Sequence, residues 1–205
     1  MSEKRRGDII PEQQSGVKTN TETSTKMSSR DEAKTFYEKV KHRLLQVNSW
    51  HHWAGSLSAN FQLTNKEGQE VDRPAEKDDH FKIDIPGPGP ETGDGFDWVQ
   101  VEAIEETEKD EEQSIAIRVR PATNPNNDKK DVAHFFSDEA TSCFMIKREG
   151  NTVTAAVYGR NEKPNTDTET TGDKARNAAV ATGAIAAFSK LQWKSLVNGL
   201  VKKED

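Results

Sequence analysis

The chain has 205 residues and a formal net charge of -6. Its hydrophobic share is 32%, or about 38% with its 13 glycines, which is low against the roughly 45 to 50%, glycine included, of typical soluble domains. The acidic balance argues against a nucleic-acid partner, because binding to phosphate backbones needs a clustered basic face. One cysteine, Cys143, excludes an intramolecular disulfide. Neither a secretory signal nor a bilayer-length apolar run is found. We therefore expect a soluble, cytoplasmic protein with no membrane partner.

Residues 1–28 are rich in serine, threonine, glutamate and lysine and contain few large apolar side chains. Such a segment cannot offset the entropy of ordering itself. We therefore predict a flexible N-terminal arm over residues 1–28, which orders only on a partner. The remaining residues, 29–205, are expected to form a single domain, because domains usually span about 100 to 200 residues.

The first regular element is predicted to be a helix that begins at Ser29 and ends near Asn48. Ser29 and Glu32 have the spacing of a capping box. The apolar residues that follow recur on one face of a helix, namely Ala33, Phe36, Tyr37, Val40, Leu44 and Val47.

Seven later segments have the alternating or continuously apolar character of β-strands. They span residues 57–63, 81–85, 99–103, 115–119, 132–136, 141–148 and 152–160. The short connections between them favour an antiparallel, up-and-down meander over parallel crossovers.

Residues 174–201 predict a long C-terminal helix that is apolar around much of its circumference. Its uncharged run is too short to cross a bilayer of about 30 Å, so we expect Trp193 and Leu196 to pack against the sheet. The predicted fold class is therefore α+β, with a curved antiparallel sheet of about seven strands packed on a long C-terminal helix and one N-terminal helix. In the order of its elements the chain resembles helix-grip and related sheet-plus-helix domains, although no motif assigns it to a family.

The sequence has no P-loop, HExxH, GxSxG or CxxC motif, and we predict no catalytic residue, no metal site and no cofactor. The loop "DIPGPGPETGDGFDW", residues 84–98, is unsuited to phosphate because its prolines lack backbone donors and its acidic groups repel anions. Its carboxylates also lack the spacing of a calcium loop. Cys143 is expected to be a buried core residue, and a zinc site at His51 and His52 would lack two ligands.

A seven-stranded meander would gather "NSWHHWAG", the Pro/Gly loop, the segment "PATNPNNDK" and the turn "EGN" at one end of the sheet. The acidic turn 107–112 and the polar linker 161–172 would lie at the other end. We predict a binding surface at the first end, because prolines stiffen loops that carry aromatic and amide side chains. Its residues would be Trp50, His51, Trp53, Asp94, Asp97, Trp98 and Asn126. The alternative is that the tryptophans plug the open end of the core.

The segment "YGRNEKPN" places Tyr158, Arg160, Asn161 and Glu162 at the end of the last strand. Arg160 is a candidate binding residue, because an arginine at a strand end can clamp a carboxylate. In so acidic a chain it can equally pair with a neighbouring aspartate or glutamate.

Three functions remain open on the sequence alone. The first is a non-catalytic interaction or assembly module that docks on a protein partner or a sister subunit through its arm and the Pro/Gly/Trp loop end. The second is a carrier of a small apolar ligand in a cavity between the sheet and the C-terminal helix. The third is a hydrolase or isomerase that uses dispersed residues such as His134, Arg160 and Asp97. A filled core with an exposed apolar patch would favour the module, and a cavity of about 300 Å³ or more would favour the carrier.

Overall fold

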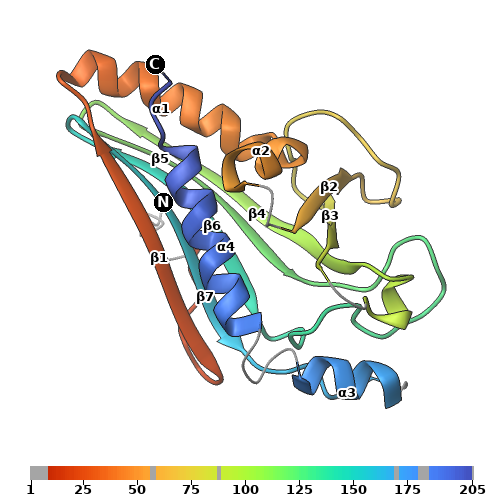
Figure 1. The fold of residues 1–205 in the computed structure, drawn as a ribbon. Helices are drawn as coiled ribbons and strands as arrows, with labels where there is room; N and C mark the ends of the chain where they lie inside the picture. The colour runs from red at the N-terminus through yellow and green to blue at the C-terminus, as the bar shows by residue number, and fades with distance from the viewer. Residues whose placement is uncertain (1–8, 56–58, 87–88, 169–170, 180–184, 205) are drawn as a thin grey trace, which may run out of the picture.

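A computed structural model describes residues 9–55, 59–86, 89–168, 171–179 and 185–204 (Figure 1). Seven strands and several helices follow one another along these residues. The strands are β1 (Val17–Lys26), β2 (Asn60–Thr64), β3 (His80–Asp84), β4 (Asp97–Lys109), β5 (Glu112–Pro121), β6 (Thr141–Glu149) and β7 (Thr152–Glu162). The helices are α1 (Arg30–Leu45), α2 (Trp50–Ala54), α3 (Thr171–Ala179) and α4 (Ile185–Leu200), with short 3₁₀ turns at Val47–Ser49 and Glu91–Gly93.

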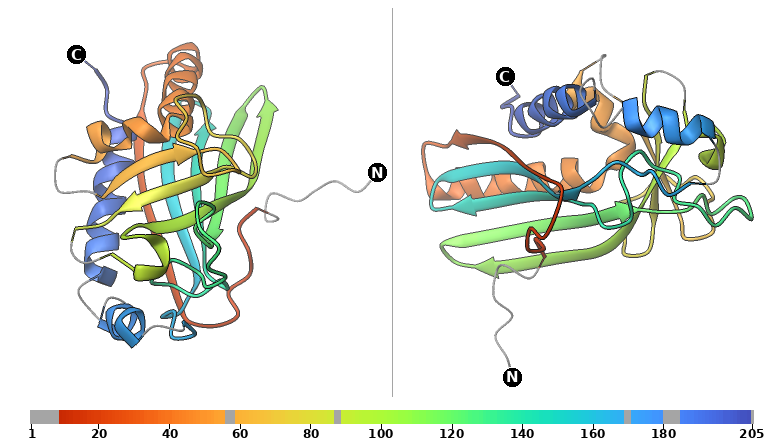
Figure 2. Two further views of the ribbon diagram at one scale, coloured as in Figure 1. Left: turned by 90° about the vertical axis from the view of Figure 1, so that its right-hand side faces the viewer. Right: turned by 90° about the horizontal axis from the view of Figure 1, so that it is seen from below.

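The strands form one antiparallel sheet in the order β1-β7-β6-β5-β4-β3-β2. Strands β2 to β7 follow one another as the expected meander, and β1 is added beside β7 at the far edge. The sheet is curved around α4, which lies along its inner face (Figures 1 and 2). The α+β arrangement predicted from the sequence, a curved antiparallel sheet packed on a C-terminal helix, is therefore confirmed.

The main core lies between the inner face of the sheet and helices α1, α2 and α4. Helix α1 begins as the sequence predicts, because the Ser29 hydroxyl accepts a hydrogen bond from the backbone N–H of Glu32. Its apolar face is buried against β6 and β7. From α4, the buried side chains include Leu196, Val197 and Leu200. Lys190 and Trp193 of α4 face the first half of β1 and the end of β7.

The prediction of a flexible arm over residues 1–28 is wrong for residues 17–26, which form β1. This strand pairs with β7 from Val17↔Glu162 to Lys26↔Thr152. Its composition is polar, but Thr19, Thr21, Thr23 and Thr25 alternate along it, and β-branched threonine suits an extended strand. Ile9 is also buried, against the outer face of the sheet. Residues 1–8 of the predicted arm lie outside the described residues.

The predicted strand at residues 132–136 is also absent, and the sheet reaches seven strands through β1 instead. Only an isolated bridge joins Phe136 to Pro164. Because this strand is absent, the two connections that follow it in the chain lie at the opposite ends of the sheet from those predicted. The turn at Gly150 lies beside the acidic turn, where its N–H donates to the carbonyl of Glu111, and the linker after β7 lies at the Pro/Gly end, where Asp173 accepts from the N–H of Glu91.

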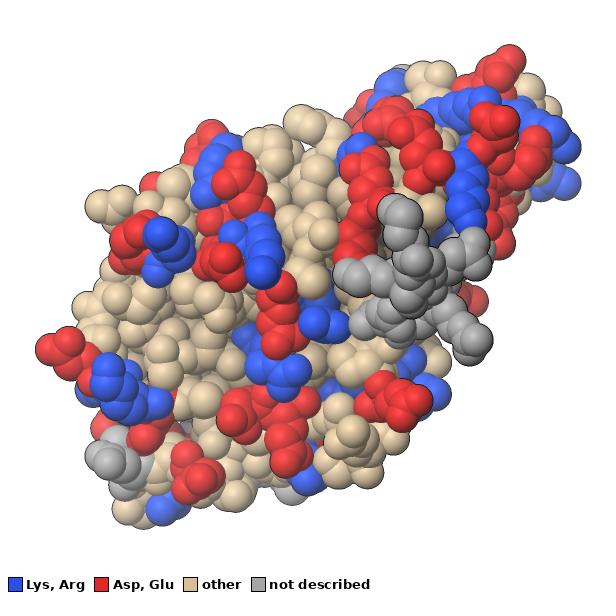
Figure 3. All heavy atoms as spheres, turned by 180° about the vertical axis from the view of Figure 1, so that it is seen from behind, with Lys and Arg blue, Asp and Glu red and all other residues tan. Residues whose placement is uncertain are grey.

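The predicted helix 174–201 consists of two described helices, α3 and α4, and its central residues 180–184 lie outside the described part. Leu196 is buried as expected, whereas Trp193 is half-buried. No helix in the described residues is long and apolar enough to cross a membrane. The outer face of the molecule mixes acidic and basic side chains (Figure 3), as in the ion pairs of Glu102 with Arg118 and Arg120.

Candidate functional site

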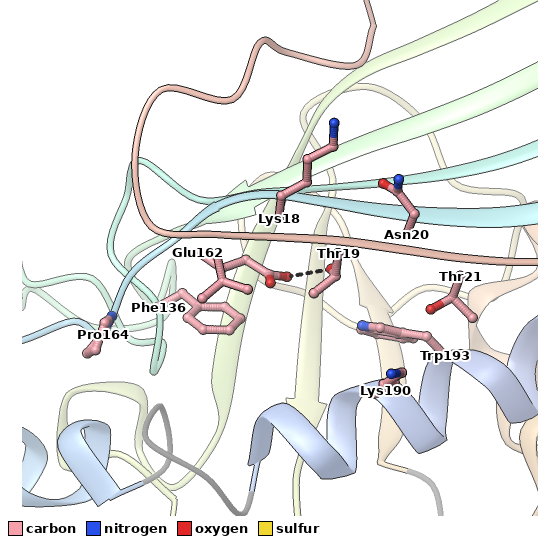
Figure 4. Close-up of a pocket in the computed structure, with 10 residues that line it drawn as sticks. Lys18, Thr19, Asn20, Thr21, Phe136, Glu162, Pro164, Lys190 and Trp193 are labelled. Carbon is pink, nitrogen blue, oxygen red and sulfur yellow. Dashed lines mark hydrogen bonds between the residues drawn. The ribbon is translucent and has the colours of Figure 1, made fainter.

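A cavity of about 300 Å³ lies between the first half of β1, the end of β7 and helix α4 (Figure 4). Its wall is mainly apolar, with four apolar side chains and the inward-facing threonines of β1. The lining residues are Val17, Lys18, Thr19, Asn20, Thr21, Phe136, Glu162, Pro164, Lys190 and Trp193. Only one of these, Glu162, is an acid.

The alternation of β1 determines which of its side chains meet the cavity. Thr19 and Thr21 point toward α4, whereas Lys18 and Asn20 point to the other side of the strand (Figure 4). Trp193 of α4 forms the facing wall, and its ring also packs against Phe61 and Phe144 of the main core. The cavity is therefore a continuation of the core in which the space between sheet and helix is not filled by described side chains.

A bulge at the end of β7 turns Glu162 toward this cavity. Val17 pairs with Glu162 and Thr19 pairs with Gly159, so β7 has one more residue than β1 between these two pairs. Within this bulge Asn161 has a left-handed backbone conformation, with φ of 55°. Asparagine tolerates this conformation better than most residues. Bulges of this kind redirect side chains next to binding sites. Without it, regular alternation would place Asn161, not Glu162, on the inner face with Gly159.

Contacts from the N-terminal segment hold Asn161 in this conformation. The Oδ1 of Asn161 accepts hydrogen bonds from the backbone N–H groups of Gln14 (2.8 Å) and Ser15 (3.2 Å). The N–H of Asn161 donates to Oε1 of Gln13 at 3.1 Å. The segment before β1 therefore stabilises the backbone that places Glu162 in the cavity.

Gly159 provides the space that the Glu162 carboxylate occupies. A methyl group in place of the Gly159 hydrogen would overlap both the Glu162 carboxylate and the Thr19 hydroxyl. That hydroxyl donates to Oε1 of Glu162 at 3.3 Å. The glycine, the bulge and the threonine thus act together to seat one carboxylate in a largely apolar wall.

Burial dominates the electrostatics of Glu162, whose exposed fraction is 8%. Desolvation raises its pKa from 4.5 to about 7, while the Thr19 hydrogen bond and the nearby charge of Arg160 act in the opposite direction. Within the described residues, no lysine or arginine lies at ion-pair distance from this carboxylate. Glu162 can therefore exchange a proton near neutral pH and can accept hydrogen bonds from a molecule in the cavity.

The predicted surface at the Pro/Gly loop is assembled, but its polar groups mostly bind one another. Asp94 accepts hydrogen bonds from Asn124 (2.9 Å) and Asn127 (3.0 Å), and Asn126 donates to the carbonyl of Gly68 at 3.2 Å. Asp97 and Trp98 are buried. Their partners are the N–H of Phe135 and the carbonyl of Gly93. These contacts join the two loops and stabilise that end of the sheet.

The tryptophan and histidine candidates on α2 separate into different environments. Trp50 is fully buried among Phe61, Phe81 and Phe144, so it plugs the core, as the alternative interpretation has it. Trp53 is half-buried, with the Arg43 guanidinium 4.1 Å from its ring centre. Exposed His51 borders an open groove of about 300 Å³ near the Pro/Gly loop, and Phe96 of that loop lies on the same groove.

The remaining candidates do not form a reactive group. Arg160 donates to the carbonyls of Thr19 and Gly159 and to Oδ1 of Asn20, so it fastens β1 to β7 from the outer side. Burial raises the pKa of the Cys143 thiol to about 12, which leaves it protonated and unreactive at neutral pH. His134 is stacked on Phe135 and its Nδ1 accepts from the N–H of Phe136. No group of three or more metal-ligating side chains occurs among the described residues.

Glu162, Thr19, Thr21 and Phe136 were not predicted as site residues. The segment "YGRNEKPN" contains Glu162, but the binding residue predicted within it is Arg160. The sequence does contain a usable signal. Asparagine directly after a strand-like run is a common site of left-handed backbone, and a turn there reverses the alternation that follows it.

No protein-family model and no curated protein matches the sequence. Solved structures of similar outline include the ginseng major latex-like protein 151 from Panax ginseng, with 15% identity, a TM-score of 0.36 and coverage of 84% of this chain and 98% of that one. Another is a truncated norcoclaurine synthase from Thalictrum flavum, with 7% identity, a TM-score of 0.42 and coverage of 95% and 100%. A Bacillus halodurans protein shows 14% identity, a TM-score of 0.42 and coverage of 90% and 97%. At these identities and scores the likeness does not bear on ligand or activity, which rest on this chain's own residues.

Proposed function

We propose that this protein is a carrier of a small, largely apolar molecule, which it holds in the cavity between β1, β7 and α4. The observation that supports this proposal most directly is the cavity itself. Its volume of about 300 Å³ lies at the lower end of the range of about 300 to 1,000 Å³ for ligand pockets. Its wall combines apolar side chains with a single buried carboxylate, and a few polar groups in an apolar wall are typical of sites that bind small molecules.

The docking-module alternative has less support in the structure. Part of its proposed arm is β1, whose backbone is already paired with β7. At the loop end, the aspartate and asparagine side chains that would recognise a partner are engaged within the chain. The larger groove of about 460 Å³ between α1 and the C-terminal residues is open and is bordered mainly by charged side chains.

The enzyme alternative requires His134, Asp97 and Arg160 to act on one substrate. None of the three belongs to the cavity wall, and Arg160 lies on the other side of β7 from the cavity. We therefore assign no reaction to the cavity.

The experiment that tests the carrier function is a titration of the full chain with N-phenyl-1-naphthylamine, a neutral apolar fluorophore. We expect saturable binding of one molecule per chain. Thr21→Phe would fill part of the cavity and should weaken binding by about tenfold or more, which is the effect of about 1.4 kcal/mol. Glu22→Phe introduces the same ring on the opposite side of β1 and serves as the matched control, with circular dichroism to check that both variants fold.

Two results would contradict the proposal. One is the absence of saturable binding to the folded wild-type chain. The other is equal binding by Thr21→Phe and Glu22→Phe, because the fluorophore would then occupy another surface.

A further inference from the structure

Among the described residues, Glu162 is the one buried charged side chain in the cavity wall, and two local features of the backbone place it there. Asn161 adopts a left-handed backbone, and Gly159 is kept free of a side chain next to the carboxylate. Left-handed backbone at a non-glycine residue is strained, although asparagine tolerates it better than most residues, and it recurs at functional sites. Burial of an ionised carboxylate without a paired cation is unfavourable, and groups with pKa values perturbed in this way are concentrated at functional sites.

The hydrogen-bonding capacity of Glu162 is largely unused by the described residues. An ionised carboxylate has about four acceptor positions, and Thr19 supplies one donor, at 3.3 Å. The nearby cations are directed elsewhere. Arg160 binds carbonyl and amide oxygens of β1 and β7, Lys18 points to the other side of β1 (Figure 4), and Lys163 pairs with Glu139 at 2.8 Å.

Lys190 of α4 also contributes to the cavity wall, and its positive charge would favour an anionic ligand over a cationic one. Its side chain is exposed, so water screens its charge. Glu162, at 8% exposed, is screened much less. Aromatic rings of Phe136 and Trp193 line the same space, and a ring face attracts a cation.

From this geometry we propose that the ligand is an amphipathic amine, with an apolar body that fills the cavity and one ammonium group that binds the Glu162 carboxylate. This inference rests on the proposed carrier function and names the class of ligand. The ammonium group would supply the donors that Glu162 lacks and would neutralise its buried charge. The apolar body would replace water along the walls formed by Val17, Phe136 and Trp193.

Three compounds that share one apolar body test the assignment: 1-naphthylmethylamine, 1-naphthylmethanol and 1-naphthoic acid. Each is used to displace the neutral fluorophore from the full chain at about pH 8, where Glu162 is mostly ionised and the amine is charged. We expect the amine to bind about tenfold or more tightly than the alcohol, and the acid to bind weakest. Glu162→Gln should remove the advantage of the amine and leave the affinity for the alcohol within about threefold.

Glu139→Gln is the matched control. This glutamate lies near the same end of the sheet and is largely exposed, in a pair with Lys163. Its replacement removes a carboxylate without changing the cavity wall, and the preference for the amine should persist.

A second measurement uses pH. Lowering the pH to about 5.5 protonates Glu162 and should reduce amine affinity by about tenfold, with little effect on the alcohol. The other charged groups around the cavity are Lys18, Lys190, Arg160 and Lys163, and Lys163 lowers the pKa of Glu139, which keeps that acid ionised. Glu162→Gln must abolish the pH dependence if Glu162 is its source, because a dependence that arises from another group, such as His134 beyond Phe136, would remain.

The outcomes separate this inference from the carrier function. If the fluorophore and the alcohol bind but the amine has no advantage, or if its advantage survives Glu162→Gln, the amine assignment is overturned and the carrier function stands. Tightest binding by the acid, lost in Lys190→Gln, would show that Lys190 sets the preference and would also overturn it. If the fluorophore itself does not bind, both proposals fail.

Discussion

Replacing Glu162 with glutamine should stabilise the empty protein, and the gain should depend on pH. The carboxylate is buried in a mainly apolar wall, which makes its ionisation unfavourable in the folded state. Glutamine has nearly the same shape and retains an oxygen that can accept the hydrogen bond from the Thr19 hydroxyl. It carries no charge, so the variant avoids the cost of ionisation while keeping the contact.

The pH dependence of this gain in stability follows from the raised pKa of Glu162. At about pH 4 the carboxyl group holds its proton in both the folded and unfolded chain, and the two proteins should be equally stable. Between 4.5 and about 7 the unfolded chain releases this proton first, so the free energy of unfolding of the wild type falls as the pH rises. Above about pH 8 both states are ionised and the whole cost is present.

The size of the gain in stability follows from the pKa values of Glu162 in the folded and unfolded chain. A pKa of about 7 in the folded chain against 4.5 for an exposed glutamate, at about 1.4 kcal/mol for each pH unit, corresponds to about 3 kcal/mol. The Glu162→Gln variant should therefore exceed the wild type by about 3 kcal/mol at about pH 8.5 and by roughly zero at about pH 4.

Urea unfolding at a series of pH values measures this difference, with Glu139→Gln as the control. The Lys163 ammonium lowers the pKa of Glu139, so that variant should lose stability at neutral pH and approach the wild type at low pH. A Glu162→Gln curve that runs parallel to the wild-type curve over the whole range would refute the reasoning, because it would mean that the carboxylate is solvated and not buried in the cavity.

Three further outcomes follow from the packing. Amide hydrogens of β1 that pair with β7 should exchange slowly by mass spectrometry or NMR, and exchange as fast as in an unstructured peptide across residues 19–25 would restore the prediction of a flexible arm. Trp50→Ala should lower the free energy of unfolding in urea by about 3 to 5 kcal/mol, since it empties a fully buried site among aromatic rings; a loss below about 1 kcal/mol would contradict its place in the core. Cys143, buried and with a pKa of about 12, should resist N-ethylmaleimide in the folded protein at about pH 8 and react once urea unfolds it.

Apolar periodicity predicted most of the architecture and failed where a strand is made of polar residues. The runs around Phe81, Val101 and Ile117 alternate because one face of each is buried in the core, and that burial requires apolar side chains. Strand β1 faces the cavity and α4 with threonines, which hydrogen-bond to polar groups such as the Asn198 side chain and the carbonyl of Val201. An analysis that scores only apolar alternation cannot find such a strand.

The error at residues 132–136 has a different cause. "VAHFF" is apolar enough for a strand, yet its backbone bonds are made to scattered partners. The N–H of Ala133 binds the carbonyl of Ala122, and the carbonyl of Ala133 accepts from Trp98. Ala133 and Phe135 are buried and Phe136 lines the cavity, although this segment forms no strand of the sheet. A short apolar run indicates burial more reliably than it indicates a strand.

The site was less predictable than the fold because it depends on a change of alternation. Sequence periodicity places every second residue of β7 on the inner face, as with Val153, Ala155 and Val157. Continuing that rule would bring Asn161 inward. The bulge replaces it with Glu162, and a single left-handed residue is enough to make this exchange. The residues predicted from the loops, such as Asp94, Asp97 and Asn126, instead stabilise the end of the sheet that carries the Pro/Gly loop.

The N-terminal segment is common to these two errors, because residues that composition assigns to a flexible arm also form part of the cavity wall. Gln13, Gln14 and Ser15 fix the backbone of Asn161 by hydrogen bonds. Strand β1 then supplies Thr19 to the Glu162 carboxylate and closes one side of the cavity. Since β1 is an edge strand with pairing on one side only, its separation from β7 requires breaking fewer contacts than the opening of a central strand. Displacement of β1 would therefore uncover the Glu162 carboxylate, which is 8% exposed, at a lower cost than displacement of a central strand.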